Sequence, residues 1–219
     1  MKLPQPRAIL FDLDGTLADT APDLAGAVNQ MRLARGLSPT PYENLRPVAS
    51  SGARGLLAAA FGITPEAPEY EAMRIDFLNR YETGLVIDSR LFDGVADLLV
   101  QLEQRGLAWG IVTNKAARFT DPLAPLLGLG HAGCIISGDT TPHSKPHPAP
   151  LLEAAARLQL APQECWYVGD DLRDIQAGRA AGMPTIAAAW GYCGDAAPTT
   201  WGADELIHTP LQLLDLLRS

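Results

Sequence analysis

The chain has 219 residues, of which 47% are hydrophobic and 19% charged, and acids outnumber bases to give a formal net charge of −8. This composition excludes disordered and fibrous chains, and the acidic balance excludes a generic binder of nucleic acid, which needs a basic face. The apolar runs are the length of strands, so we expect no membrane span. Such a protein can hold an anionic group only through a few local residues.

The amino-terminal residues rise from a polar start into a short apolar run that ends at Asp12. This run lacks the apolar length and the small-residue cleavage site of a secretory leader, so we expect a cytoplasmic protein. The three cysteines, Cys134, Cys165 and Cys193, form no CxxC pair. Free thiols are therefore favoured over a disulfide scaffold or a zinc ribbon.

Short apolar runs that end beside polar or glycine residues are typical of buried parallel strands. They span residues 8–11, 108–112, 166–168 and 185–189. Helical periodicity lies between and after them, over residues 95–102 before Gly106, 151–158 after Pro148, and 210–217 with Pro210 in the first turn. The alternation predicts an α/β fold, a doubly wound parallel sheet with right-handed crossovers.

This alternation stops between Asp19 and about Ile87, where the pattern is helical throughout. Three helices are expected, over residues 24–31, 56–61 and 70–81, and prolines mark the segments between them. The simplest arrangement is an all-helical domain inserted after the first strand. The predicted domains are thus a core of residues 1–18 and 88–219, and a helical cap of residues 19–87.

Two clusters of acids follow two of the predicted strands. Asp12 and Asp14 lie two apart in the sequence FDLDGT, where an extended chain points both to one side, and Asp170, Asp171 and Asp174 follow the run at 166–168. The carboxyl ends of strands in open α/β sheets are where ligands bind. Acids crowded at one edge need a cation, and oxygen ligands favour Mg²⁺. Either cluster alone also fits a capped helix start.

Groups that suit an anion stand between these clusters in the chain. Thr113 and Asn114 end another strand, and Lys145 precedes a helix. A hydroxyl, an amide and an ammonium are the complement that an anionic group needs beside carboxylates.

The order DxDGT, TN, KP and GDDxxxD resembles the four signature motifs of the haloacid dehalogenase superfamily, and the resemblance spans essentially the whole chain. It implies a Rossmann-like core, an inserted helical cap and an aspartyl-phosphate mechanism. By position, Asp12 would be the nucleophile and Asp14 the general acid and base. Mg²⁺ would be held by Asp12, the backbone carbonyl of Asp14 and Asp170, with Asp174 or Asp171 in support. Thr113, Asn114 and Lys145 would bind the phosphoryl oxygens.

Asp14 favours a phosphatase over a dehalogenase, because a departing halide needs no proton. Two alternatives stay open, a phosphosugar mutase of the same superfamily and a binding module without catalysis. The expected partner is a small phosphorylated metabolite, with no nucleic acid and no membrane, and the expected assembly is a monomer or homodimer.

The substrate group is suggested by further resemblance. FDLDGTLADTAPDL is similar to the phosphoglycolate phosphatases, whereas SGARG, RLFDG, WGIVTNK and GDDLRDI are more similar to bacterial N-acetylmuramic acid 6-phosphate phosphatases of peptidoglycan recycling. Both substrates carry a carboxylate, which Arg54 in the small-residue turn of the cap could pair with. An ordinary surface arginine is the equal alternative.

Other conspicuous residues are given structural interpretations. His143 and His147 with Cys134 lack a fourth ligand for zinc, and Trp109, Trp166, Trp190 and Trp201 are expected to serve packing. Lys115 and Arg118 are expected to be solvated.

Overall fold

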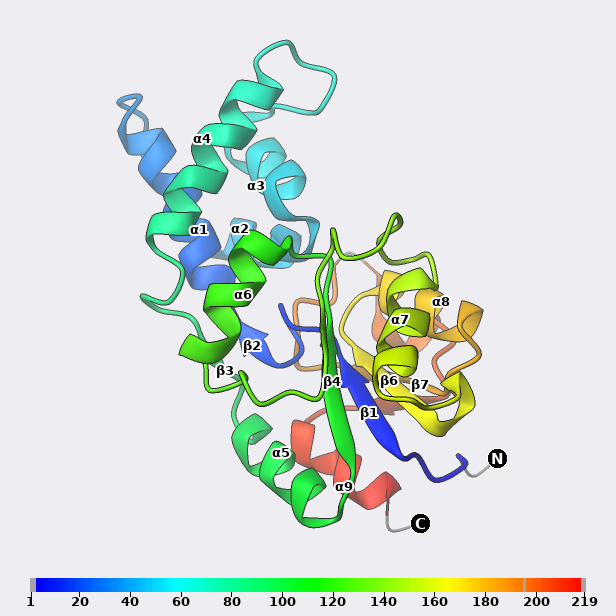
Figure 1. The fold of residues 1–219 in the computed structure, drawn as a ribbon. Coiled ribbons are helices and arrows are strands. Elements are labelled where there is room, and N and C mark those ends of the chain that lie inside the picture. The colour runs from blue at the N-terminus through cyan, green and yellow to red at the C-terminus, as the bar shows by residue number, and fades with distance from the viewer. Residues whose placement is uncertain (1–2, 195, 218–219) are drawn as a thin grey trace. The chain divides into compact units, whose positions relative to one another are not determined.

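The computed structural model describes residues 3–194 and 196–217 of the chain. Contacts divide the chain into two compact units, which are Met1–Ala18 with Leu91–Ser219, and Asp19–Arg90 (Figure 1). We call the first the core unit and the second the helical unit. The two short strands β2 (Ala18–Asp19) and β3 (Arg90–Leu91), which pair with each other, span the two points where the chain passes between units.

The core unit is built on a six-stranded sheet in the order β5-β4-β1-β6-β7-β8, and every pair in this sheet is parallel. The strands are β1 (Ala8–Phe11), β4 (Ala108–Val112), β5 (Ile135–Ile136), β6 (Cys165–Gly169), β7 (Thr185–Ala188) and β8 (Glu205–Ile207). Residues of β1 and β6 are buried on both faces of the sheet, which explains their unbroken apolar sequences. The predicted doubly wound α/β sheet is confirmed.

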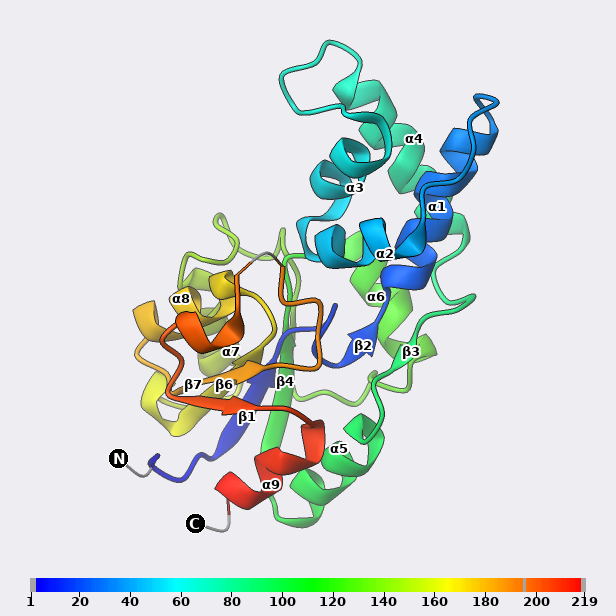
Figure 2. The ribbon, with the colours of Figure 1, turned by 180° about the vertical axis from the view of Figure 1, so that it is seen from behind.

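Helices cover both faces of this sheet, as the two opposite views show (Figures 1 and 2). On one face, α7 (Ala149–Arg157) and α8 (Leu172–Ala180) pack on alternate residues of the central strands, including Leu10, Val112 and Tyr167. On the other face lie α5 (Val95–Gln104) and the short α9 (Leu213–Leu216). Since β1 and β6 are central, the residues that follow them emerge in the middle of the sheet's carboxyl edge.

One helical prediction needs correction, and no helix was predicted between β4 and β5. The last helix was expected from Pro210 onward, but residues Pro210–Gln212 form a 3₁₀ turn and only α9 is helical beyond it. The helix α6 (Ala117–Leu126) was not expected at all, because Pro122 and Pro125 lie within it and proline disfavours a helix interior. Its buried face, with Phe119 and Leu123, compensates for this disadvantage.

The helical unit contains α1 (Ala21–Leu33), α2 (Tyr42–Leu45), α3 (Gly52–Phe61) and α4 (Tyr70–Thr83), with a 3₁₀ segment at Arg46–Ser51. Its described residues 20–89 include no strand. Apolar residues at helical spacing, such as Val28 and Met31 of α1 and Phe77 of α4, form its buried interior. In the described residues of both units, no helix has the length and hydropathy needed to cross a membrane.

One buried carboxylate ties the helical unit together. Asp23 in the first turn of α1 accepts hydrogen bonds from the backbone N–H groups of Ile87, Asp88 and Ser89 at 3.1, 2.9 and 3.0 Å, and from the Ser89 hydroxyl. These bonds fix the segment that follows α4 against the start of α1. The Asp23 carboxylate is thus stabilised by the fixed dipoles of N–H and hydroxyl groups.

Candidate active site

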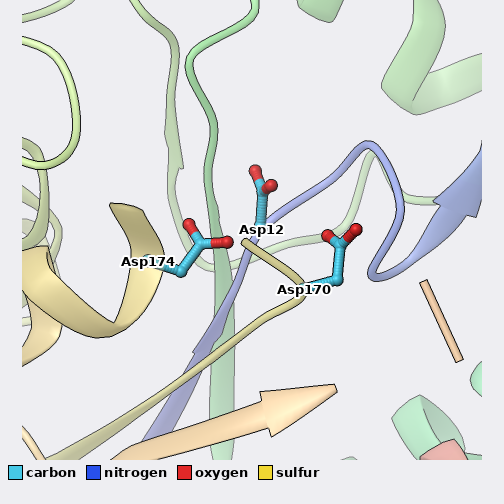
Figure 3. Close-up of side chains that lie close together, drawn as sticks. All are labelled: Asp12, Asp170 and Asp174. Atoms are coloured by element: carbon cyan, nitrogen blue, oxygen red, sulfur yellow. The ribbon is translucent and has the colours of Figure 1, made fainter. Parts of the chain in front are cut away.

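Three carboxylates converge where β1 and β6 end (Figure 3). Asp12 directly follows β1, and its backbone N–H continues the sheet by donating to the carbonyl of Val168 at 2.9 Å. Asp170 directly follows β6, and Asp174 lies in the first turn of α8. One ligand oxygen from each lies within 4.8 Å of the others. The structure therefore brings together members of both predicted acidic clusters.

The Lys145 ammonium is buried among these acids. It lies 2.8 Å from Asp12 Oδ1 and donates to Asp174 Oδ1 at 2.7 Å, to the Val112 carbonyl at 2.9 Å and to the Tyr167 hydroxyl at 2.8 Å. Its three N–H groups thus have four acceptors within reach. An ammonium with spare acceptors can redirect one N–H to an incoming oxygen without leaving a buried proton unbonded.

Tyr167 is a residue of this site that the sequence reasoning missed. Its hydroxyl approaches the Val112 carbonyl at 2.9 Å and Asp174 Oδ1 at 3.1 Å, and it accepts from Lys145. Burial and the nearby charge of Asp174 raise the pKa of Tyr167 well above its usual range, so the phenol stays neutral. The available signal was a tyrosine in an apolar strand, three residues before the first acid, Asp170.

Asp170 is held by groups from two other segments. Its Oδ1 accepts from the Thr16 hydroxyl at 2.9 Å, and its Oδ2 accepts from the backbone N–H of Tyr192 at 2.8 Å. The indole N–H of Trp190, expected only to pack, donates to the Thr16 carbonyl at 3.0 Å. The segment after β7 therefore fixes both Asp170 and the loop after Asp14.

Three glycines make room for these carboxylates. A Cβ atom on Gly15 would lie 2.2 Å from Asp170 Oδ2, one on Gly191 would lie 2.3 Å from Asp170 Cβ, and one on Gly169 would lie 2.3 Å from Asp174 Cγ. Gly15 also has a φ of 91°, a conformation that favours glycine. The close packing of the acids depends on these absent side chains.

Burial and crowding alter how these groups ionise. Burial raises the pKa of Asp12 to about 7; the Lys145 ammonium opposes this rise, and the charges of Asp174 and Asp14 add to it. Burial, together with the charges of Asp12 and Asp174, raises the pKa of Asp170 well above its usual range. Burial alone would lower the pKa of Lys145, but Asp12 and Asp174 hold it above its ordinary value. Lys145 therefore stays charged, and the acids lack sufficient positive charge to ionise easily.

The donor set suits a hard divalent cation. Asp12 Oδ1, although close to Lys145, has no hydrogen bond of good geometry among the described residues. A carboxylate oxygen carries two lone pairs, and each oxygen of Asp170 uses one of them in the hydrogen bonds given above. A cation among these oxygens would relieve the repulsion that raises their pKa values, and oxygen-only ligands favour Mg²⁺. The residues present fit such an ion.

Thr113 and Asn114 follow β4 at the same edge of the sheet. The Thr113 hydroxyl oxygen accepts from the backbone N–H of Lys115 at 3.1 Å, which leaves its own proton for another acceptor. The Asn114 amide makes two hydrogen bonds to the backbone of Lys145: Nδ2 donates to the Lys145 carbonyl at 3.0 Å, and Oδ1 accepts from the Lys145 N–H at 2.9 Å. The Asn114 side chain therefore positions Lys145.

Comparison with known proteins identifies the family. A profile of haloacid dehalogenase-like hydrolases matches residues 6–182. A phosphoglycolate phosphatase from Xanthomonas campestris is 51% identical over 210 residues, which cover 95% of each chain. An N-acetylmuramic acid 6-phosphate phosphatase from Pseudomonas aeruginosa is 43% identical over 219 residues, which cover 99% of this chain and 97% of that protein. The chain belongs to the haloacid dehalogenase-like hydrolases.

The solved structures agree with this assignment. The crystal structure of a predicted phosphoglycolate phosphatase from Haemophilus somnus superposes with a TM-score of 0.86 at 27% identity, and covers 97% of this chain and 98% of its own. The structure therefore confirms the Rossmann-like core that the motifs implied. With curated relatives that are phosphatases, this hydrolase is a phosphatase of the family.

Asp171 of the hydrolase does not join the three acids. It caps the amino terminus of α8 by accepting from the Arg173 N–H at 2.9 Å, and its carboxylate pairs with the Arg173 side chain at 2.8 Å. Asp174 completes the capping box through the N–H of Asp171 at 3.1 Å. The helix-cap interpretation of this motif therefore holds for Asp171 and Asp174, while Asp170 and Asp174 are the members of the motif that lie in the group able to hold a metal ion.

Lys115 corrects an expectation. Its side chain is buried, not solvated, and its ammonium lies 2.8 Å from Asp14 Oδ1. No local sequence pattern predicts this pair, because the two residues are 101 positions apart. Arg118, by contrast, is exposed, and its guanidinium lies 4.5 Å from the Phe119 ring centroid.

The remaining singled-out residues lie elsewhere in the phosphatase. Arg54 is exposed on α3 of the helical unit. The pKa of Glu66 is lowered mainly by the hydrogen bonds of its carboxylate, and the charge of Arg54 adds to this effect. His143 and His147 pack ring to ring, with centroids 4.3 Å apart. Cys134 is buried between Gly110 and the Ala154 carbonyl.

Proposed function

We propose that this phosphatase is a Mg²⁺-dependent phosphomonoesterase that works through an aspartyl-phosphate formed on Asp12. The observation that supports this most is the placement of Asp12. It lies at the centre of the sheet's carboxyl edge, between the buried ammonium of Lys145 and the carboxylates of Asp170 and Asp174. A carboxylate in such a site is shielded from bulk water, and the ammonium beside it can bind the phosphoryl group that the carboxylate attacks.

The proposed reaction has two steps. A carboxylate oxygen of Asp12 attacks phosphorus in line as the ester P–O bond breaks, and Asp14 gives its proton to the departing oxygen. Asp14, now a carboxylate, takes a proton from water as that water attacks the aspartyl-phosphate, which returns Asp12 as a carboxylate and releases inorganic phosphate. After the second step Asp14 is protonated again and Asp12 is a free carboxylate, so the cycle closes with protons and charge balanced.

The phosphoryl oxygens would be bound by Lys145, by the Thr113 hydroxyl and by the remaining amide hydrogen of Asn114. Asp12, Asp170 and the backbone carbonyl of Asp14 would hold Mg²⁺, with Asp174 in support. When bound, the ion supplies charge stabilisation to the phosphoryl group in transfer. A cation and an ammonium together let an acidic protein bind an anionic substrate.

The proposed substrate is a small carboxylated or sugar phosphate. N-acetylmuramic acid 6-phosphate and 2-phosphoglycolate are the leading candidates, because relatives at 43% and 51% identity are phosphatases named for them. Arg54 is the proposed contact for the carboxylate that these compounds share.

The test is phosphate release by the purified full chain across a panel of metabolite phosphates, with Mg²⁺ and with a chelator. We expect release with Mg²⁺ only, and a higher kcat/KM for one of the two candidates in a direct comparison. Product analysis by NMR separates the alternatives. Free phosphate supports a hydrolase, an isomerised phosphosugar indicates a mutase, and no turnover of any compound would contradict the proposal.

Arg54 is tested separately. Arg54→Ala should raise KM for the carboxylated substrate while leaving hydrolysis of p-nitrophenyl phosphate largely unchanged. Arg74→Ala is the matched control, because Arg74 is a surface residue of the same unit that pairs with Glu71 at 2.7 Å. Equal loss on both substrates would refute a specificity role for Arg54.

A further inference from the structure

Lys115 and Asp14 form an ion pair that is largely buried. The side chains are only 8% and 14% exposed, and their charged atoms lie 2.8 Å apart. The pair of Arg7 and Glu164 in the same unit is, by contrast, 66% and 38% exposed. An exposed ion pair does little to fix the orientation of its side chains, because solvent and side-chain freedom compete with the pairing. A buried pair fixes both side chains.

The backbone that carries Lys115 is fixed on several sides. Its N–H donates to the Thr113 hydroxyl at 3.1 Å, and its carbonyl accepts from the Gly138 N–H at 2.8 Å and from the Thr120 hydroxyl at 3.3 Å. The turn also packs closely on Gly138, where a Cβ atom would lie 2.2 Å from the Asn114 carbonyl oxygen. The ammonium therefore reaches Asp14 from a rigid support.

The other end of the pair lies beside the nucleophile. Asp14 follows Asp12 by two residues, directly beyond the carboxyl end of β1. Its backbone is held where Gly15 N–H donates to the Ala18 carbonyl at 2.9 Å. Proton transfer requires the carboxyl group within about 3 Å of the leaving oxygen, so the orientation of this side chain governs its efficiency.

On the basis of the proposed function, we propose that Lys115 is a positioning residue that holds the Asp14 carboxyl group where it passes a proton to the leaving oxygen. Lys115 keeps its own protons throughout. The proton moves from Asp14 to the ester oxygen as the P–O bond breaks, and Asp14 regains one from the attacking water. Lys115 donates to Asp14 Oδ1, so the proton that Asp14 transfers is carried on its other oxygen, Oδ2, and Lys115 contributes only by fixing the orientation of the carboxyl group.

The leaving group makes this role measurable. An alkoxide needs a proton as it departs, whereas p-nitrophenolate leaves readily without one. For Lys115→Met we expect kcat/KM to fall about 100-fold for the best alkyl phosphate of the panel and less than about fivefold for p-nitrophenyl phosphate. Lys115→Arg, which keeps the charge, should restore most of the alkyl activity. Arg7→Met is the control for loss of an ion pair in the core unit and should change neither rate.

A double-variant cycle tests whether Lys115 acts through Asp14. Asp14→Asn should show the same selectivity for the leaving group, and Lys115→Met added to it should cause no further loss. Lys115→Gln is measured in parallel, and melting temperatures report whether each variant is folded. Equal losses on both substrates, or additive losses in the double variant, would overturn the inference.

The same data separate this inference from the proposed function. If Asp14→Asn is selective for the leaving group and folded Lys115→Met is not, the role of Lys115 is wrong and the reaction scheme stands. If Asp14→Asn loses both substrates equally, or the unaltered protein releases no phosphate, the reaction scheme itself is wrong.

Discussion

Two buried carboxylate sites in this molecule differ in how well fixed donors and cations compensate their charge. In the helical unit, Asp23 accepts bonds from three backbone N–H groups and a hydroxyl. In the core unit, Asp12, Asp170 and Asp174 crowd together beside the ammonium of Lys145, and burial and mutual repulsion raise the pKa values of Asp12 and Asp170. A buried acid with a full set of fixed donors stabilises its segment, whereas acids with too few favour binding of a cation.

The largest expected effect is the loss of turnover when the proposed nucleophile, Asp12, is replaced. Asp12→Asn should lower turnover by at least about 10⁴-fold, because a neutral amide is a poor nucleophile and a weaker ligand. Phosphate release measures the loss, and mass spectrometry of quenched reactions should detect phosphorylated protein only when Asp12 is intact. Substantial residual activity of the variant with Mg²⁺ would refute the covalent mechanism.

The pH dependence of stability tests the charge imbalance directly. The pKa of Asp12 rises from 3.8 to about 7 on folding without metal, so the folded protein retains a proton there that the unfolded chain releases between these values. The metal-free protein should therefore lose stability as pH rises from about 4 to about 7, and Asp170 acts in the same direction. The Asp12 contribution is on the order of 4 kcal/mol.

Urea unfolding at pH 5 and pH 7.5 in a chelator measures this change. Asp12→Asn serves as the reference that cancels the titrating groups away from the acidic cluster, and the wild type should lose more stability with rising pH than this variant. Saturating Mg²⁺ should abolish the difference in slope, since the cation replaces the proton. If the free energy of unfolding changed equally with pH in the two metal-free proteins, the pKa of Asp12 would not be raised by folding.

Removing the charge of Asp23 should lower stability and leave the effect of Mg²⁺ unchanged. Asp23→Asn removes the charge and turns an amide NH₂ toward N–H groups, so the free energy of unfolding should fall by about 1–3 kcal/mol. The increase in melting temperature on adding Mg²⁺ should be unchanged. Asp88→Asn is the matched control, because the Asp88 side chain is exposed beside the same hydrogen bonds. A reduced effect of Mg²⁺ in Asp23→Asn would break the contrast between the two sites.

The smallest expected effect separates Asp171 from Asp174. Asp171→Ala should cost about 1 kcal/mol through loss of the helix cap, while Mg²⁺ affinity changes little. Asp171→Asn, which can still cap, should recover most of that stability. Asp174→Asn should weaken Mg²⁺ binding more than either, as followed by calorimetric titration, and a larger loss in the Asp171 variants would reverse the assignment.

The fold was largely predictable because buried parallel strands leave apolar runs that end in polar turns. The runs at 8–11 and 108–112 coincide with β1 and β4, the run at 166–168 is one residue shorter than β6 at each end, and the run at 185–189 is one residue longer than β7. The two-residue β5 and the half-exposed β8 carry no such signal. The helix α6 was missed because its burial, which propensity does not report, outweighs its prolines.

The candidate site was predictable where function imposes a local pattern. The acids at 12, 14, 170 and 174 follow strands, and the topology of the sheet brings the strands together. Tyr167 and Lys115 were missed for the converse reason. Each acts through a partner distant in the chain, and a tyrosine in a strand or a lysine in a turn is ordinary until that partner is known.

Gly15, Gly169 and Gly191 constrain how relatives of this enzyme should be judged. An alanine at any of these positions would preserve every acid, hydroxyl and ammonium of the reaction scheme, yet its methyl group would occupy space now filled by Asp170 or Asp174. A homologue that has lost activity can therefore keep an intact set of catalytic residues. Checking those residues alone would misclassify it, so glycine at these three positions should be checked together with the carboxylates.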